Sequence, residues 1–448
     1  MTTRSLEIIC AIFAMAVFAG GSFAQETQQP SDQDDVQQLS LKADDLLKSG
    51  KYDETFPVCE QMVKLDPKFF GGYFCRSLAY HGKKDLQREV EELTKALGLR
   101  PDIYIFNRNR GLALFKLNEF ARSEGDFTIY LEKEPDDMEI FYYQGVNRLN
   151  LNKYDLALKD FSEVIKREPK VSATFYMRAR TYSLMNDPAR AVSDFTKAIE
   201  LDPTDLESIT RRADAYRELK KYDLAYADLD RVLAADPKNI NALEYRAVLT
   251  RDTGTLAEAK AAFERVISVA PDFEAPYVEL SFIYFKVENF KKVLEMAEVA
   301  KKLDPSSQMA FNNAGYARIM LGDVANAEKD IDKALELDPN LALALNNRAL
   351  IKIKRKQYDL ALKDIARVLE LAPELSYAYM NRASVFLETG HLDKALADIN
   401  EALKLEPDLR PALEIRARIY SGLRKKTLAA ADRRRSAQLL AEKKKTLH

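Results

Sequence analysis

Apolar residues recur every three or four positions along most of the chain, in stretches of about a dozen residues that short polar segments separate. This spacing places the apolar side chains on one face of an α-helix, as in helices that pack against a core. A proline follows every second stretch, and proline cannot continue a helix. The pattern therefore predicts an all-α chain of consecutive helix pairs.

The prolines that end the predicted pairs lie 34 residues apart throughout the chain. They are Pro67, Pro101, Pro135, Pro169, Pro203, Pro237, Pro271, Pro305, Pro339, Pro373 and Pro407. With this proline at repeat position 32, eleven repeats without insertions fill residues 36–409, and repeat 1 begins at Val36. A fixed period of this length indicates stacked units that bury one continuous core, which no unit could form alone.

Other repeat positions support the same frame. Position 8 is always Ala, Ser or Gly, and position 20 is alanine in seven repeats, so the two helices of a pair can approach closely. Position 24 is often bulky and apolar, as at Phe161 and Phe195, and such a residue fills the space between them. Position 15 is often glycine or asparagine, which tolerate the left-handed conformation that ends a helix.

The period, the small position 8, the alanine at position 20 and the proline resemble the tetratricopeptide repeat family over residues 36–409. The first two repeats depart most, with Thr55 and Glu89 at position 20 and Pro57 inside a second helix. The resemblance implies a right-handed superhelical solenoid of antiparallel helix pairs. It also implies a concave groove, lined by repeat positions 2, 5, 6, 9 and 12, that binds a partner peptide or helix.

The first 24 residues have the pattern of a signal peptide. Arg4 precedes an apolar run over residues 8–19, and Ser22-Phe23-Ala24 supplies small residues for cleavage. The alternative is a membrane anchor, but the run is well short of the ~20 residues that a spanning helix needs. We expect an exported protein, periplasmic if bacterial and otherwise secreted or in the secretory lumen, with a flexible leader at residues 25–35.

Residues 410–448 begin as a twelfth repeat and then degenerate, as a capping helix would. They contain 12 basic and 3 acidic residues. Six of the basic residues form what we name the basic tip: Arg433, Arg434, Arg435, Lys443, Lys444 and Lys445. The tip either contacts an anionic membrane or acidic protein, or is a solvated cap. The net charge of the chain is only −2, which does not favour nucleic acid as a partner.

Two cysteines, Cys59 and Cys75, remain after the predicted cleavage. Cys59 is at position 24 of repeat 1, and Cys75 is at position 6 of repeat 2. The two position numbers add up to thirty, as expected for residues that face each other on neighbouring antiparallel helices. In an oxidising compartment they can form a disulfide. The alternative is a pair of buried free thiols that act as small apolar residues.

Arginine is common at position 7 and an acid at position 23, a combination suited to two-bond ion pairs. We expect each acid to bind the arginine of the next repeat. With this pairing, the acid and the arginine are both absent at the same two junctions, those that follow the seventh and eighth repeats. The expected pairs are Glu92–Arg110, Asp160–Arg178, Asp194–Arg212, Asp228–Arg246, Asp330–Arg348, Asp364–Arg382 and Asp398–Arg416. Residues 240–307 should then be both a hinge and a partner site, unless their aromatic residues simply replace the ion pairs as packing.

The expected function is a non-enzymatic protein-binding scaffold, and the alternative is a holdase-like chaperone that uses apolar patches of the groove. The chain has three scattered histidines, no phosphate-binding glycine loop and no cofactor or metal motif, and no pattern specifies an oligomeric state. Asparagine amides can donate to and accept from a peptide backbone; the alternative is that they only hydrate the groove. The candidate binding residues are Asn109, Phe115, Tyr142, Tyr143, Tyr176, Phe282, Phe285, Asn312, Asn313, Tyr316, Asn346, Asn347 and Asn381.

Overall fold

The computed structural model describes residues 30–445, and their side chains from residue 35 to residue 441. Within this range the regular structure consists of 24 helices and contains no strand, so the predicted all-α solenoid of helix pairs is confirmed. The expected signal peptide at residues 1–24 lies outside the described residues.

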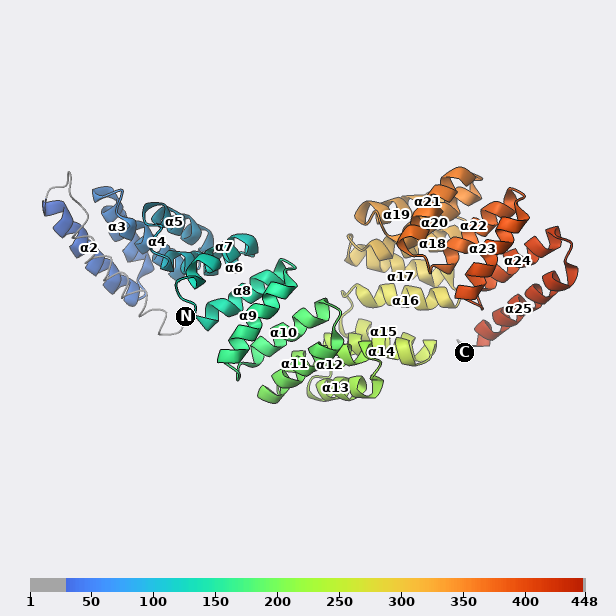
Figure 1. Ribbon diagram of the computed structural model, residues 1–448, viewed down its shortest axis with the longest axis horizontal. Coiled ribbons are helices and arrows are strands. Elements are labelled where there is room, and N and C mark those ends of the chain that lie inside the picture. Colours follow the sequence, from blue (N-terminus) through green and yellow to red (C-terminus); the bar gives the residue numbers. More distant parts are fainter. Residues whose placement is uncertain (1–29, 446–448) are drawn as a thin grey trace. The chain divides into compact units, whose positions relative to one another are not determined.

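The described residues divide into two compact units, one ending at Leu219 and one beginning at Lys220. Figure 1 shows the helices of both units in chain order. Unit 1 contains α2 (Pro30–Lys48), α3 (Tyr52–Leu65), α4 (Phe70–Gly82), α5 (Leu86–Leu99), α6 (Ile105–Lys116), α7 (Phe120–Leu131), α8 (Met138–Asn150), α9 (Tyr154–Arg167), α10 (Ser172–Leu184), α11 (Pro188–Leu201) and α12 (Leu206–Glu218). Unit 2 contains α13 (Tyr222–Ala235), α14 (Ile240–Thr253), α15 (Leu256–Val269), α16 (Ala275–Lys286), α17 (Phe290–Leu303), α18 (Gln308–Leu321), α19 (Val324–Leu337), α20 (Ala342–Lys354), α21 (Tyr358–Leu371), α22 (Ser376–Glu388), α23 (Leu392–Leu405), α24 (Arg410–Gly422) and α25 (Lys426–Lys445). The even-numbered helices are the first helices of their repeats, and α16, α18, α20, α22 and α24 contact one another in that order.

The first helix begins earlier than the repeat frame indicates. α2 begins at Pro30, so residues 30–35, which we expected to belong to a flexible leader, are helical. Proline is favoured at the first helical position because its fixed φ suits the helix and its missing N–H would have no partner there.

Repeat position 15 has a positive φ more often than its glycines and asparagines indicate. Lys84, Lys220, Glu288, Lys356 and Arg424 adopt φ values of 56–60° at this position, in addition to three glycines and three asparagines. Gly254 does not, because a capping box between Thr255 and Glu258 starts α15 and Gly254 is extended. The turn geometry of the repeat therefore overrides the residue preference.

Positions 8 and 24 pack directly against each other, as the sequence predicts. A Cβ atom added to Gly145 would lie 2.6–3.0 Å from ring atoms of Phe161, and one added to Gly111 would lie 2.6 Å from Phe127. Both phenylalanine rings are fully buried. The small residue at position 8 thus makes room for the bulky residue at position 24 of the same helix pair.

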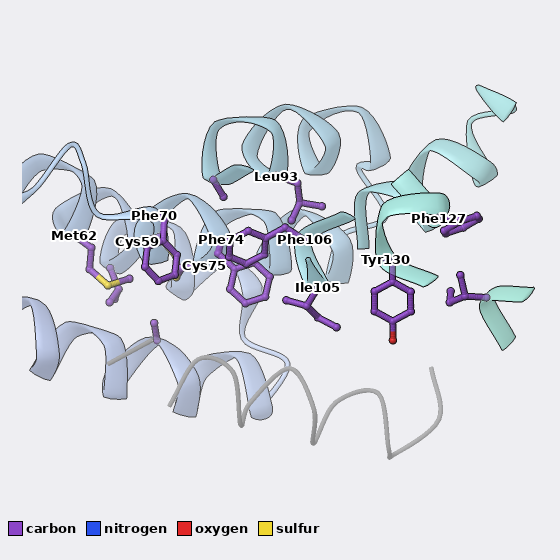
Figure 2. Packing of buried hydrophobic residues seen from close by; sticks show 14 residues of the cluster. Cys59, Met62, Phe70, Phe74, Cys75, Leu93, Ile105, Phe106, Phe127 and Tyr130 are labelled. Carbon is purple, nitrogen blue, oxygen red and sulfur yellow. A yellow bond between two sulfur atoms is a disulfide. The ribbon is translucent and has the colours of Figure 1, made fainter. Parts of the chain in front are cut away.

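The core of repeats 1–4 contains the two cysteines. Figure 2 shows Cys59, Cys75, Met62 and the rings of Phe74 and Phe106 in one buried cluster, in which the two ring centroids lie 4.8 Å apart. Cys59 and Cys75 are fully buried and form a disulfide between α3 and α4, with their Cα atoms 5.7 Å apart. This bond joins the second helix of repeat 1 to the first helix of repeat 2.

The expected ion pairs between successive repeats are wrong. In six repeats the arginine at position 7 binds the acid at position 23 of its own repeat, with nitrogen–oxygen distances of 2.6–3.0 Å. These pairs are Arg76–Glu92, Arg110–Asp126, Arg178–Asp194, Arg348–Asp364, Arg382–Asp398 and Arg416–Asp432. The ion pairs therefore join the two helices of one repeat.

The same arginines contact the preceding repeat through a different position. Arg110 donates to Thr94, Arg178 to Ser162 and Arg416 to Asn400, over distances of 3.0–3.2 Å. All three acceptors occupy position 25. Each arginine thus spans a repeat junction, but its partner in the preceding repeat is a hydroxyl or amide rather than the predicted carboxylate.

Repeat 8 lacks this ion pair. Its positions 7 and 23 are Leu280 and Met296, and both belong to a hydrophobic cluster with Phe263 and Ile283. Apolar packing therefore replaces the charged contact. The boundary between the two units lies after Leu219, and the hinge expected at residues 240–307 stays a prediction.

Asp160 should make the stability of unit 1 dependent on pH. Burial raises its pKa to about 6, and the bond from Arg148 only partly opposes this because Arg148 also binds Glu124. Its pKa is 3.8 without these influences, so the native state holds the proton more tightly than the unfolded state. The free energy of unfolding should therefore fall as the pH rises from about 4 to about 6.

The variant Asp160→Asn tests this expectation. Between pH 4 and pH 7 its unfolding free energy, relative to wild type, should rise by about 2 kcal/mol, because one pKa unit corresponds to about 1.4 kcal/mol and part of the shift is lost to solvent access. Urea unfolding at several pH values measures it. Lys159→Gln, an exposed change on the same helix, is the control, and parallel pH profiles for Asp160→Asn and wild type would contradict the expectation.

Candidate partner-binding site

The first helices of repeats 7–11 enclose a cavity of about 400 Å³ within unit 2. Most of its lining comes from α16, α18, α20 and α22, each of which contacts the next, and Arg251 of α14 completes it together with residues of the adjoining segments. The lining residues are Arg251, Val278, Glu279, Ser281, Phe282, Phe285, Lys286, Val293, Met309, Asn312, Asn313, Tyr316, Leu343, Asn346, Asn347, Leu375 and Tyr377.

Aromatic side chains form one wall of the cavity. Phe282 and Phe285 stack with their ring centroids 6.2 Å apart, and Phe285 also contacts Tyr316 at 5.2 Å. Phe282 keeps 43% of its surface exposed, whereas burial of Tyr316 raises the pKa of its hydroxyl to about 12. The wall therefore combines an accessible aromatic ring with tyrosine side chains that stay uncharged.

Asparagine side chains form a hydrogen-bonded row along the cavity. Asn347 donates to Oδ1 of Asn312 at 2.8 Å, Asn312 donates to Asn313 at 3.1 Å, and Asn313 donates to Ser281 at 2.8 Å. The next junction repeats the first bond, because Asn381 donates to Asn346 at 2.9 Å. The amides thus bind one another across repeat junctions, and they are held in place before any partner arrives.

Two asparagines of this row have an amide N–H donor that is still available. Each asparagine amide has two N–H donors, and Asn313 and Asn347 each use one of them within the described residues. Four of these asparagines line the cavity, and their bonds between repeats are a role that the sequence did not indicate.

Charged residues at the cavity are paired or lie over a ring. Arg251 binds Glu279 with two contacts of 2.8 Å, and the ammonium group of Lys286 lies 5.0 Å from the ring centroid of Phe282. Cation–π contacts of this kind hold a lysine head near an aromatic face. The cavity is consequently apolar and neutral, with a short polar row.

A long-range ion pair lies near Tyr316 and Tyr377. Arg410 donates to both carboxylate oxygens of Glu288, at 3.1 and 2.9 Å, although the two residues are 122 positions apart. The negative charge of Glu288 also helps to raise the pKa values of Tyr316 and Tyr377, which shows that it lies close to both. This ion pair joins the turn after α16 to the start of α24.

Seven of the predicted binding residues come together in this cavity. They are Phe282, Phe285, Asn312, Asn313, Tyr316, Asn346 and Asn347. Asn381 lies beside them through its bond to Asn346 but does not line the cavity.

The other predicted residues lie in unit 1 and are divided among several clusters. Phe115 contacts Tyr143 at 4.9 Å at the edge of the core of repeats 1–4, and Tyr142 packs on Phe161. Tyr176 packs on Phe195, in a third cluster. Asn109 is buried. These residues therefore contribute to packing and do not line the cavity of unit 2.

Some lining residues were missed, although the repeat positions could have found most of them. Met309 and Tyr377 occupy position 2, Glu279 position 6 and Arg251 position 12, which are groove positions in the family that the sequence resembles. Lys286, Val293 and Leu375 lie at other positions and had no such signal.

The arginines of the basic tip are exposed on α25. Arg433 donates to Ser421 at 3.1 Å and Arg435 binds Asp408 at 2.7 Å, so both also contact the repeat array. The side chains of Lys443, Lys444 and Lys445 lie outside the described part of the chain. Binding of the tip to an anionic surface stays a prediction.

Other kinds of site are not found in the part of the chain that the structure describes. No helix between residues 30 and 445 combines the length and the apolar character needed to cross a bilayer. Among residues with described side chains, no three of His, Cys, Asp and Glu converge as metal ligands would.

Family models described as tetratricopeptide repeat match residues 108–170, 172–205, 210–273, 310–341 and 348–420. The chain carries tetratricopeptide repeats. Several solved structures are similar to it, and three of them have 14–18% sequence identity to this chain. One is in the Cut9-Hcn1 hetero-tetramer of the APC/C (14% identity, 97% of this chain and 98% of that chain covered, TM-score 0.47). Others are the C-terminal part of a TPR repeat-containing protein from Cytophaga hutchinsonii (18%, 52% and 96%, 0.44) and a tetratricopeptide repeat protein from Parabacteroides merdae (17%, 63% and 98%, 0.40).

Proposed function

We propose that this tetratricopeptide repeat protein is a non-enzymatic scaffold that binds a segment of a partner protein in the cavity of unit 2. One observation carries the proposal: a single cavity brings together an accessible aromatic wall and a fixed row of amides. Burying an aromatic ring supplies binding energy, and amides that are already ordered satisfy peptide groups at little entropic cost.

The double variant Phe282→Ala/Phe285→Ala should weaken this binding at least about 30-fold. Aromatic anchors at the centre of an interface contribute about 2 kcal/mol or more, which corresponds to about a 30-fold loss of affinity. The measurement is a quantitative pull-down from the exported fraction with wild-type and variant protein, followed by titration of any stoichiometric partner.

Leu224→Ala/Leu360→Ala is the matched control, since both leucines are exposed on second helices of unit 2. It should keep the partner. A melting temperature of the phenylalanine variant well below that of wild type would show that the two rings are core residues instead. Retention of many unfolded clients, without a stoichiometric partner, would favour the holdase-like chaperone.

We also propose that the scaffold works outside the cytoplasm. The signal-peptide pattern of residues 1–24 supports this location, and so does the Cys59–Cys75 disulfide, because such bonds persist in oxidising compartments. Mass spectrometry of the natural protein should find Gln25 as its amino-terminal residue, whereas a mature chain that retains residues 1–24 would contradict the proposal.

A further inference from the structure

Helix α25 packs on α24 and leaves much of its own surface exposed (Figure 1). Lys426, Arg433 and Leu440 follow one another at intervals of seven residues, so they lie on one line along the helix. Ala430 and Ala437 lie between them, and all five residues are exposed. We name these five residues the outer stripe. It is straight and smooth, with two cations at one end and a leucine at the other.

Two further cations lie beside the basic end of the outer stripe. Arg424 and Lys425 belong to the turn between α24 and α25, and Arg433 donates to Ser421, close to that turn, at 3.1 Å. We name Arg424, Lys425, Lys426 and Arg433 the basic corner. All four are exposed, and none has a carboxylate partner among the residues whose side chains the structure describes.

The acids near the basic corner already have partners. Asp432 is buried and binds Arg416 at 2.8 Å, and Asp408 binds Arg435 at 2.7 Å. Like charges that gather at one place repel one another unless an opposite charge balances them. The basic corner therefore presents positive charge that the described side chains do not balance.

The basic corner also lies at the positive end of a helix. The peptide dipoles of a helix favour an acid in its first turn. The second helices α9, α13, α21 and α23 follow this rule with an aspartate at repeat position 18. Helix α25 has Thr427 at this position and no acid in its first turn. The start of the helix and the four cations therefore favour the same kind of ligand, an anion.

We propose that the basic corner and the outer stripe bind the surface of an anionic lipid bilayer. Lipid phosphates lie in a plane, and a straight stripe about 20 Å long can lie along it. The lysine and arginine heads bind phosphates, while their methylene stems and Leu440 lie against the more apolar layer below. An acidic protein would need carboxylates at fixed positions, whereas mobile lipids adjust to the side chains. This inference goes beyond the proposed scaffold function and does not depend on it.

Co-sedimentation of the mature chain with lipid vesicles tests the inference. Vesicles of phosphatidylcholine with about one third phosphatidylglycerol should bind the chain, and vesicles of phosphatidylcholine alone should not. Each lysine or arginine near an anionic membrane contributes about fivefold to the affinity, so Lys425→Gln/Lys426→Gln/Arg433→Gln should weaken binding about 100-fold. Salt at about 1 M should abolish binding, because it shortens the screening length to ~3 Å.

Thr427→Asp separates lipid binding from folding. The aspartate restores the acid that four other second helices carry at position 18, so it suits the start of α25. It also adds a negative charge beside the basic corner. This variant should weaken vesicle binding at least about fivefold without lowering the melting temperature.

Lys159→Gln/Lys238→Gln/Lys363→Gln is the matched control, because it removes the same charge from exposed sites outside α25. It should bind vesicles as wild type does, and so should Phe282→Ala/Phe285→Ala. A loss for the control equal to that of the basic-corner variant would overturn the inference, as would equal binding to both kinds of vesicle or binding to neither. Retention of an acidic protein by the basic corner, with anionic vesicles left unbound, would overturn it in favour of a protein partner.

Discussion

Replacing Phe161 with alanine should lower the free energy of unfolding of unit 1 by about 3–5 kcal/mol. The ring is fully buried at repeat position 24, and it packs so closely on α8 that even a methyl group at Gly145 would collide with it. Removal of the ring leaves a space that the two helices cannot fill without moving. Because a repeat makes most of its contacts with its immediate neighbours, the loss should be concentrated in repeats 3–5.

Urea unfolding followed by circular dichroism measures the size of this effect, and hydrogen exchange shows where it lies. Leu156→Ala is the control on the same helix, because that leucine is 39% exposed and its truncation should cost less than about 1 kcal/mol. Equal losses for the two variants would show that the packing of positions 8 and 24 does not stabilise the pair.

The helix pairs could be predicted from sequence because their core is local. Position 8 and position 24 meet inside one repeat, as Gly145 and Phe161 do, so the residues that form a contact lie only 16 positions apart. The fixed period then places every later copy. A proline at the end of each pair leaves few alternatives for the chain.

The ion pairs were assigned to the wrong helix because neighbouring residues of a helix point in different directions. Cys75 at position 6 faces the preceding repeat and bonds Cys59, whereas Arg76 at position 7 faces its own repeat and binds Glu92. Consecutive side chains are rotated by about 100° around the helix. The Cys59–Cys75 and Arg76–Glu92 pairs each span 16 residues, and in each pair the two repeat positions add up to thirty. Spacing alone therefore did not show that the first pair joins two repeats and the second joins the two helices of one repeat.

Part of the cavity lining could be predicted from the repeat positions. Repeat positions identify which side chains point into the groove, and this placed Phe282, Phe285 and Tyr316 correctly at the cavity. The ion pair between Glu288 and Arg410 had no signal, because it depends on how tightly repeats 8–12 wind. Small rotations between repeats accumulate along a solenoid, and no local sequence pattern records them.

Reduction of the Cys59–Cys75 disulfide should lower the free energy of unfolding of unit 1 by about 3 kcal/mol. The bond closes a loop of 16 residues, and cross-links of this length restrict the unfolded chain by about that amount. Both cysteines are fully buried in the cluster that contains Phe74 and Phe106, so the bond also holds α3 against α4 at the end of the array. Thermal and urea unfolding with and without a reductant measure the loss.

Cys59→Ala/Cys75→Ala is the matched variant, and it should unfold as easily as the reduced wild type and show no response to the reductant. Before reduction, denatured wild-type protein should resist alkylation, because neither sulfur is free. Full alkylation without a reductant would show two buried thiols instead, and the compartment argument for export would then lose its chemical support. The disulfide could also form without stabilising unit 1. That result would mean that packing around Phe74 and Phe106 keeps α3 and α4 together even in the unfolded state. A cross-link adds no stability to helices that do not separate on unfolding.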